Sequence, residues 1–334
     1  MLGSVLRTVA EPLNAAVYFG APVNSWISSS KQNAATDPVT QRYPHLLDGT
    51  VSSRAAYHLK LNGPNLTVNT ACSSALVALS LAIETLRADK ASIAVVGGVS
   101  VDFPQEGYAT AADGRSLFSP SGICRPLDAG SDGAVPGDAM TAVVLKRASD
   151  ARRDGNRIYA VVKGVEVLAD GEGRTGYNTP HPTGQVRTIE RALRGANVSA
   201  DQIGYVEMHA SGTMMGDAIE FEALRKALGP GRNGGAPTVI ASNKGNFGNT
   251  MAASGLVSLI KVAFSLHNKV IPPMPSTFTK EPNPLLELGN RFVIPATAMP
   301  MRMLEERSER CFAGVTSLGY GGVNVHTVLA SATE

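Results

Sequence analysis

Short apolar runs alternate with longer amphipathic segments along the whole chain. The apolar runs are rich in valine and isoleucine and are bounded by Gly, Pro or Asp, which predicts buried strands. They lie at residues 16–19, 65–68, 93–96, 142–146, 160–163, 205–208, 239–241 and 311–317. Helices are predicted between them, at 73–88, 184–196, 216–228 and 252–266. This alternation favours stacked layers of helix and sheet over an all-β fold or a helical bundle.

The helix predicted after Cys72 has one apolar face. Its large apolar residues follow one another at steps of three, four and three, which places them on the same side of a helix. They are Leu76, Leu79, Ile83 and Leu86. In the helix predicted at 216–228, we expect Asp217 and Glu220 in the first turn, where negative charge suits the positive end of the helix dipole.

A polar segment divides the chain into two similar courses of strands and helices. Residues 149–156 are polar and contain a glycine. We therefore predict two halves of one domain, residues 1–157 and residues 158–334.

Composition and charge exclude several classes of protein. The chain has 334 residues, and 30 Lys and Arg against 28 Asp and Glu leave a net charge of +2. No basic stripe stands out, which argues against nucleic-acid binding. The apolar runs are far shorter than the ~20 residues of a membrane span, and the first residues lack the apolar region of a signal peptide. We expect a cytoplasmic enzyme without a membrane partner.

The three cysteines do not form a scaffold. Cys72, Cys124 and Cys311 are an odd number and include no CxxC or Cys/His pairing. A disulfide framework and a zinc site are therefore not expected. The glycine-rich segments also lack the spacing of dinucleotide-binding and P-loop motifs.

The segment LTVNTACSSALVAL places Cys72 where a strand turns tightly into a helix. The free N–H groups and dipole of a helix N-terminus favour a thiolate and lower the thiol pKa below its free value of ~8.5. The same N–H groups could hold a developing oxyanion. A buried structural cysteine is the alternative interpretation.

Three further segments carry candidate chemistry. In YVEMHASGTMMGDAIE, a strand delivers His209 into a small-residue turn, which suits a general acid or base, with a structural histidine as the alternative. In SNKGNFGNTMAASG, Lys244 and Asn249 lie five residues apart, with a surface charge and a helix cap as their alternatives. In SLGYGGVNVH, consecutive glycines let the backbone approach a ligand, with a structural hairpin as the alternative.

Taken in order, these four segments resemble β-ketoacyl synthases, in particular the ketosynthase domains of modular polyketide synthases. The resemblance runs from about residue 16 to residue 329 and includes FSPSGICRPLDAGSDG. It implies the thiolase fold, a five-layer α-β-α-β-α sandwich of two similar halves, in a homodimer. It also implies an acyl carrier protein as partner, a substrate carried on phosphopantetheine, and no intrinsic cofactor or metal.

The resemblance assigns roles to particular residues. Cys72 would be the nucleophile that takes the acyl chain, and His209 would assist decarboxylation and carbanion formation. Lys244 would tune the site electrostatically, and Glu220 would support the loop around it. The backbone N–H groups of Cys72 and Tyr320 would form the oxyanion hole, with Tyr320 also in a gating position.

Two motifs depart from the family pattern. The family loop reads N-x-G-H, whereas this chain ends it with Asn249, and an amide cannot carry a proton charge. The change is compatible with a non-elongating enzyme, and equally with the Cys-His-Asn set of the initiating ketoacyl synthases, which decarboxylate malonyl groups. The turn after His209 reads HASGT in place of HGTGT, so Ala210 and Ser211 are expected to crowd it.

Three functions remain open. We expect an acyltransferase that loads an acyl chain on Cys72 and forms a C–C bond by Claisen-type condensation. The alternative is a non-elongating enzyme that transfers or cyclises a tethered chain by an intramolecular aldol-type reaction. The third is a non-catalytic partner subunit of a condensing heterodimer, which the presence of Cys72 disfavours.

Two expectations concern the surface. Family members carry a strand upstream of residues 16–19, and a sheet without it has an exposed edge and a weaker fold. The one locally basic stretch could meet an acidic carrier protein, although a solvated connector is the favoured interpretation. It consists of Arg147, Arg152, Arg153 and Arg157.

Overall fold

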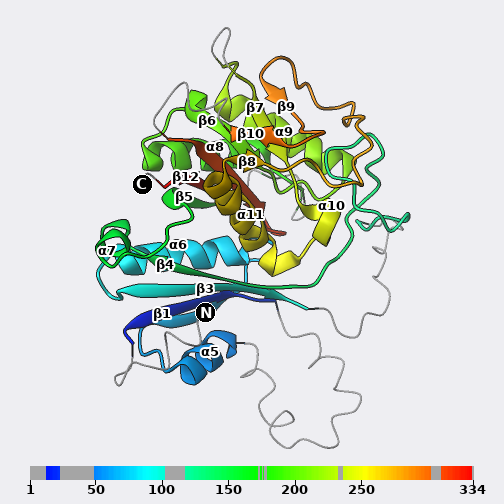
Figure 1. Cartoon of the computed structure of the whole chain (residues 1–334). Helices are drawn as coiled ribbons and strands as arrows, with labels where there is room; N and C mark the ends of the chain where they lie inside the picture. Colours follow the sequence, from blue (N-terminus) through cyan, green and yellow to red (C-terminus); the bar gives the residue numbers. More distant parts are fainter. Residues whose placement is uncertain are drawn as a thin grey trace, which may run out of the picture.

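Two mixed β-sheets, one from each half of the chain, organise the computed structural model (Figure 1). The structure describes residues 13–22, 49–101, 117–171, 174, 176, 179–231, 236–301 and 310–332. The first twelve residues, where no signal peptide is predicted, lie outside this range. No helix within the described ranges is long and apolar enough to cross a membrane.

The sheet of the first half has the strand order β2-β1-β3-β4. β1 (Ala15–Gly20) lies parallel to both β2 (Asn65–Val68) and β3 (Ile93–Ser100). β4 (Ala139–Lys146) pairs with β3 in the antiparallel direction. All four strands include the apolar runs that predict them, and the predicted bounds of β2 agree with the structure.

The sheet of the second half has the order β5-β12-β11-β6-β7-β9. Its strands are β5 (Val161–Ala169), β6 (Ile203–Glu207), β7 (Thr238–Ala241), β9 (Phe292–Val293), β11 (Phe312–Leu318) and β12 (Val323–Ala330). β6 is parallel to β7 and β11, while β12 is antiparallel to β11 and β5. The glycine-rich SLGYGGVNVH segment therefore forms the β11–β12 hairpin. β8 (Val270–Ile271) and β10 (Met299–Pro300) form a small separate sheet.

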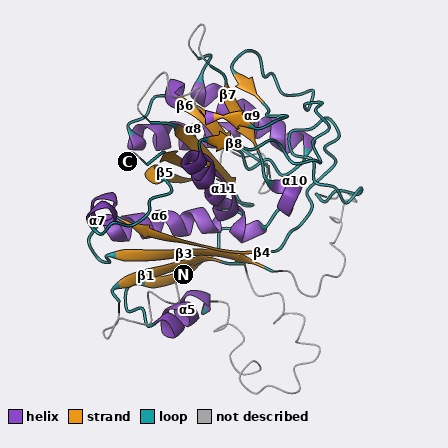
Figure 2. Ribbon diagram, viewed as in Figure 1, coloured by secondary structure: helices purple, strands orange, loops and turns teal. Residues whose placement is uncertain are grey.

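The helices complete five layers, as the family resemblance implies (Figure 2). α5 (Val51–Leu59) lies on the outside of the first sheet. α6 (Ser74–Arg87) and α11 (Ser254–Asn268) run between the two sheets. The outer layer of the second half contains α8 (Pro182–Ala196) and α9 (Met214–Leu228). The short helices are α7 (Ala148–Arg153), α10 (Lys244–Phe247), η1 (Ala200–Gln202) and η2 (Met251–Ala253).

The two central helices pack closely because their facing side chains are apolar and one residue is a glycine. Leu76 and Leu79 of α6 are fully buried, and Ile83 packs against the same core. A Cβ on Gly255 of α11 would lie 2.5 Å from Leu76 Cγ, so only glycine allows this approach. Each fully buried leucine contributes roughly 1.5–3 kcal/mol. The contact fixes the N-terminal ends of α6 and α11 next to each other.

The two sheets differ at one edge. In the second half, β5 covers the outer edge of β12. In the first sheet, β4 takes the place that β12 has in the second. β4 has no neighbour on its outer side among the described residues, and its Met140 and Val144 are 77% and 48% exposed.

Candidate active site

Cys72 lies in a tight turn between β2 and α6, as predicted. Ala71 has a φ of 56°, a left-handed conformation that is uncommon for a residue other than glycine. The hydroxyl groups of Ser317 on β11 and Ser254 on α11 donate to the Cys72 carbonyl oxygen, at 2.8 and 3.3 Å. The turn is thus fixed from both neighbouring elements.

The loop of the β11–β12 hairpin lies directly against this turn. A Cβ on Gly319 would lie 2.4 Å from the Thr70 carbonyl oxygen, so glycine is required for the approach. The backbone N–H groups of Cys72 and Tyr320 both interact with the Cys72 thiol. The Tyr320 side chain is about half exposed, at 52%.

The expectation of a lowered Cys72 pKa is wrong. Burial raises the pKa of the thiol above its ordinary value because a thiolate loses its water there. The charge of Lys244, the Asn249 side chain and the two backbone N–H groups oppose this effect without cancelling it. The helix N-terminus alone predicts the wrong sign, since burial depends on the rest of the fold.

His209 follows β6 and is held by Glu220 of α9. One Glu220 carboxylate oxygen accepts the His209 N–H at 2.7 Å, and the other accepts the Ala210 N–H at 2.8 Å. Glu220 lies in the second turn of α9 rather than the first, and its carboxylate contacts the turn after β6. The Ala210 side chain packs in the core, and the left-handed residue of the turn is Gly212, with φ +84°.

Lys244 is a buried group beside His209. It is only 1% exposed, which excludes the surface-charge interpretation. Its ammonium group donates to the His209 carbonyl oxygen and lies 3.5 Å from His209 Nδ1. Because an ammonium group can only donate, we assign Nδ1 as the acceptor and place the ring proton on Nε2. Burial and the Lys244 charge hold the pKa of His209 well below its ordinary value, so the imidazole is neutral at pH 7.

Asn249 faces the cysteine. Its side-chain Nδ2 lies 4.0 Å from Cys72 Sγ, at the limit of a hydrogen bond to sulfur. The helix-cap interpretation is wrong, since α11 begins at Ser254 with Ala253 as its N-cap. Asn249 Oδ1 is buried and finds no donor in the described part of the chain. A hydrogen-bond donor therefore points at the thiol.

A loop from the first half of the chain contacts both the turn after His209 and the loop that contains Asn249. Sequence reasoning did not predict these contacts. The Cys124 thiol donates to the Ser211 carbonyl oxygen at 3.4 Å. The Asn249 N–H donates to the Val135 carbonyl oxygen at 2.6 Å. Asp217 of α9 accepts the Leu127 N–H at 2.9 Å. The segment FSPSGICRPLDAGSDG marks this loop in the sequence, but these three contacts join residues that are distant along the chain.

The two buried carboxyl groups of α9 give an expected pH dependence of stability. Burial raises the pKa of Glu220 to about 7 and that of Asp217 to about 6. A carboxyl group whose pKa is raised by folding contributes stability that is complete below its unfolded pKa and is lost as the pH rises through its folded pKa. We expect the free energy of unfolding to fall as the pH rises from 5 to about 7, by on the order of 4 kcal/mol, and to change little above that.

Denaturant unfolding at pH 5, 6, 7 and 8 measures this effect, and E220Q provides the comparison. The variant cannot ionise at this position, so its unfolding free energy should depend less steeply on pH than that of the original chain. Equal slopes for the two proteins would exclude the assignment.

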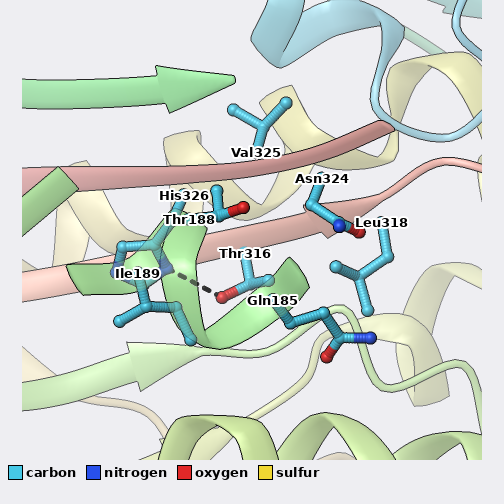
Figure 3. Close-up of a pocket in the computed structure, with 8 residues that line it drawn as sticks. All are labelled: Gln185, Thr188, Ile189, Thr316, Leu318, Asn324, Val325 and His326. Atoms are coloured by element: carbon cyan, nitrogen blue, oxygen red, sulfur yellow. Dashed lines mark hydrogen bonds between the residues drawn. The ribbon is translucent and has the colours of Figure 1, made fainter. Parts of the chain in front are cut away.

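A separate pocket lies between α8 and the β11–β12 hairpin (Figure 3). Within it, His326 Nδ1 and Thr316 Oγ1 are 3.0 Å apart, and burial lowers the pKa of His326 to about 4. Its lining residues are Gln185, Thr188, Ile189, Thr316, Leu318, Asn324, Val325 and His326. None of the predicted site residues lines it. Among the described residues, no three His, Cys, Asp or Glu side chains are grouped as metal ligands.

Two family models match consecutive parts of the chain. The model of the β-ketoacyl synthase N-terminal domain matches residues 5–151, and that of the C-terminal domain matches residues 159–277. The chain belongs to the β-ketoacyl synthase family. The site described above therefore lies in a ketosynthase with the thiolase fold, and the four sequence segments identified the family correctly.

Curated relatives place this ketosynthase among the condensing domains of polyketide synthases. A hybrid PKS-NRPS synthetase TAS1 of Gloeophyllum trabeum is 42% identical over 322 residues, which are 95% of this chain and 20% of that protein. The TAS1 of Pyricularia oryzae is 45% identical over 298 residues, 81% of this chain and 17% of that protein. The chain thus spans about a fifth of the length of these relatives.

Solved ketosynthase structures resemble this one over nearly its whole length. Ketosynthase twelve of the bacillaene polyketide synthase from Bacillus amyloliquefaciens superimposes with a TM-score of 0.86 at 30% identity. The match covers 97% of this chain and 56% of that one. The module 6 ketosynthase of the Bacillus subtilis bacillaene synthase gives a TM-score of 0.84 at 30% identity and covers 98% of this chain and 56% of that one.

Proposed function

We propose that this ketosynthase takes an acyl chain from a carrier protein onto Cys72 and forms a C–C bond by Claisen-type condensation. The observation that carries the proposal is that the Asn249 amide and the Lys244 charge both act on one thiol, with His209 beside Lys244. Asn249 Nδ2 faces Cys72 Sγ, and the Lys244 charge acts on both the thiol and the His209 imidazole.

In the first step, the Cys72 sulfur attacks the thioester carbonyl of the carrier-bound chain. A new C–S bond forms, and the phosphopantetheine thiol leaves with the proton. The Lys244 charge favours the thiolate that attacks. The N–H groups of Cys72 and Tyr320 are the donors for the tetrahedral oxygen, which is the role of an oxyanion hole.

In the second step, loss of CO₂ from a malonyl thioester leaves an enolate, which attacks the Cys72 thioester. The negative charge develops on the extender's thioester oxygen. The Nε2–H of neutral His209 and the Nδ2–H of Asn249 are the donors available to that oxygen. Collapse of the tetrahedral adduct expels the Cys72 thiolate and completes the new C–C bond.

A second candidate is ring closure of a tethered chain without extension. Two observations favour it. Asn249 replaces the second histidine of the family loop, and the two TAS1 relatives are named as hybrids of a polyketide synthase and a nonribosomal peptide synthetase. In this case a proton is lost from a carbon between two carbonyl groups of the chain, the carbanion attacks the chain's own thioester carbonyl, and the thiol leaves with the proton. Asn249 and His209 are the donors to the enolate oxygen in the same way. The non-catalytic interpretation has less support, because the Asn249 side chain, the Lys244 charge and two backbone N–H groups act on the Cys72 thiol.

An acyl carrier protein is the proposed partner, with the substrate on its phosphopantetheine, and the chain is proposed to act as a homodimer. The basic stretch gives little support for a docking surface. Arg147 pairs with Asp89 at 2.8 Å and with Asp150 at 2.6 Å. Arg153 pairs with Asp150 at 2.8 Å. Arg147 and Arg153 are thus paired with carboxylates of nearby residues.

Supplying two substrates in parallel tests the two candidates. The chain is loaded with a short acyl thioester and given malonyl carrier protein, or it is given a β-ketoacyl-aminoacyl thioester alone, and products are followed by mass spectrometry. An extended β-ketoacyl carrier protein supports condensation. A cyclic product released only from the tethered chain supports ring closure. No product from either substrate would contradict both.

Asn249 variants show which reaction depends on the amide. Removing one donor to a developing oxyanion typically costs about 100-fold to 1000-fold in rate. We expect N249A to lose this factor in C–C bond formation while it keeps acyl loading of Cys72 within a few-fold. The loading rate and the product rate are measured in the same mass-spectrometric experiment. A variant that forms product at the original rate would remove Asn249 from the mechanism.

A further inference from the structure

A buried carboxylate lies beneath the site, and no step of the proposed reaction uses it. Glu207 is the last residue of β6, two residues before His209, and it is fully buried. It accepts hydrogen bonds from the Tyr205 hydroxyl at 2.5 Å, the Asn243 N–H at 2.7 Å and the Lys261 ammonium group at 2.7 Å. A buried carboxylate is tolerated only where such partners replace its water.

These donors come from three elements that carry the site. Glu207 belongs to the strand that delivers His209. Asn243 directly precedes Lys244, and its side-chain amide also lies 3.5 Å from the Ser258 hydroxyl of α11. Lys261 belongs to α11, whose first residue, Ser254, donates to the Cys72 carbonyl oxygen. One carboxylate therefore joins the strand end, the turn before Lys244 and the central helix.

We propose that Glu207 is a positioning residue for the site: its carboxylate, with Lys261 as counter-ion, fixes the Lys244 turn against the His209 strand end. This inference rests on the proposed function, because it assigns Glu207 to the same set of groups. Glu207 acts on Cys72 through Lys244 and does not contact the substrate.

Electrostatics support the same connection. The Glu207 charge raises the pKa of Lys244 against the lowering effect of burial, which favours the ammonium form. The Lys244 charge in turn favours the Cys72 thiolate. Removing Glu207 should therefore weaken the Lys244 charge at the thiol and make Cys72 less reactive near neutral pH.

The test compares E207Q/K261M with the original chain. The double variant removes both charges, so it leaves no unpaired buried ion and should fold. We measure the rate at which iodoacetamide alkylates Cys72 from pH 6 to pH 10 and identify the peptide by mass. The expected result is alkylation about threefold slower or more at pH 7, with the pH profile displaced upward by half a unit or more.

A control variant shows whether the loss of an ion pair elsewhere in the molecule also slows the alkylation of Cys72. E222Q/R225M removes the Glu222–Arg225 pair of α9, whose atoms are 2.7 Å apart and partly exposed. This variant should keep the original alkylation profile. If E207Q/K261M also keeps it, Glu207 only neutralises Lys261 and the inference is wrong. Alkylation needs no carrier protein, so failure of the proposed function would show separately, as an original chain that alkylates normally but accepts no acyl group.

Discussion

Replacing Cys72 with alanine is expected to abolish acyl loading and product formation, by roughly 1000-fold or more. The thiol is the atom on which the Asn249 amide, the Lys244 charge and two backbone N–H groups converge. The backbone of the turn is held by Ser317 and Ser254 through the Cys72 carbonyl oxygen, which alanine retains. The variant should therefore fold and lose only its chemistry.

A matched control is C311A. Cys311 is also a buried free cysteine, and it lies at the start of β11, where its thiol contacts the Met301 carbonyl oxygen at 3.8 Å. Release of carrier thiol over time is measured for both variants, together with thermal unfolding. Loading by C72A at a rate near that of C311A would show that another residue is the nucleophile.

Replacing His209 with alanine is expected to separate the two half-reactions. General acid–base groups contribute about 100-fold to 10,000-fold, and His209 is proposed to act only where the enolate forms. H209A should therefore load Cys72 within a few-fold of the original rate and form the C–C bond 100-fold to 10,000-fold more slowly. The neutral state of the imidazole, set by burial and by the Lys244 charge, is what suits it to donate Nε2–H to the enolate.

Rapid-quench mass spectrometry resolves the two rates, and H267Q serves as the control. His267 lies in the last turn of α11, where its ring is 5.0 Å from that of Tyr159. It touches none of the proposed catalytic groups. Equal losses of loading and condensation in H209A would mean that His209 serves the acyl transfer, and the proposed division of labour would be wrong.

The sequence predicted where Cys72, His209 and Lys244 lie in the fold, because each comes shortly after the end of a strand. Cys72, His209 and Lys244 all follow short apolar runs whose ends converge in a layered fold. That these residues lie close together was predicted from the local patterns and from the order of the four segments. The same patterns predicted the central helices, because α6 and α11 carry long apolar faces.

What the sequence did not predict depends on contacts between distant segments. α5 was missed; only Ser52 and Ala56 of its nine residues are buried. The sign of the Cys72 pKa change was wrong because burial exceeds the effect of the helix N-terminus. Glu207 was not singled out, since its donors come from residues 36 and 54 positions away as well as from β6 itself.

Mapping the acyl group in a single turnover tests the central claim most directly. The original chain is mixed with one equivalent of an acyl carrier protein that bears a short acyl thioester, and the digested protein is analysed by mass spectrometry. The account predicts one acyl group, on the peptide that contains Cys72, and its loss when the carbanion-forming substrate is added. An acyl group on Cys124 or Cys311, or no acyl group on a folded chain, would contradict it.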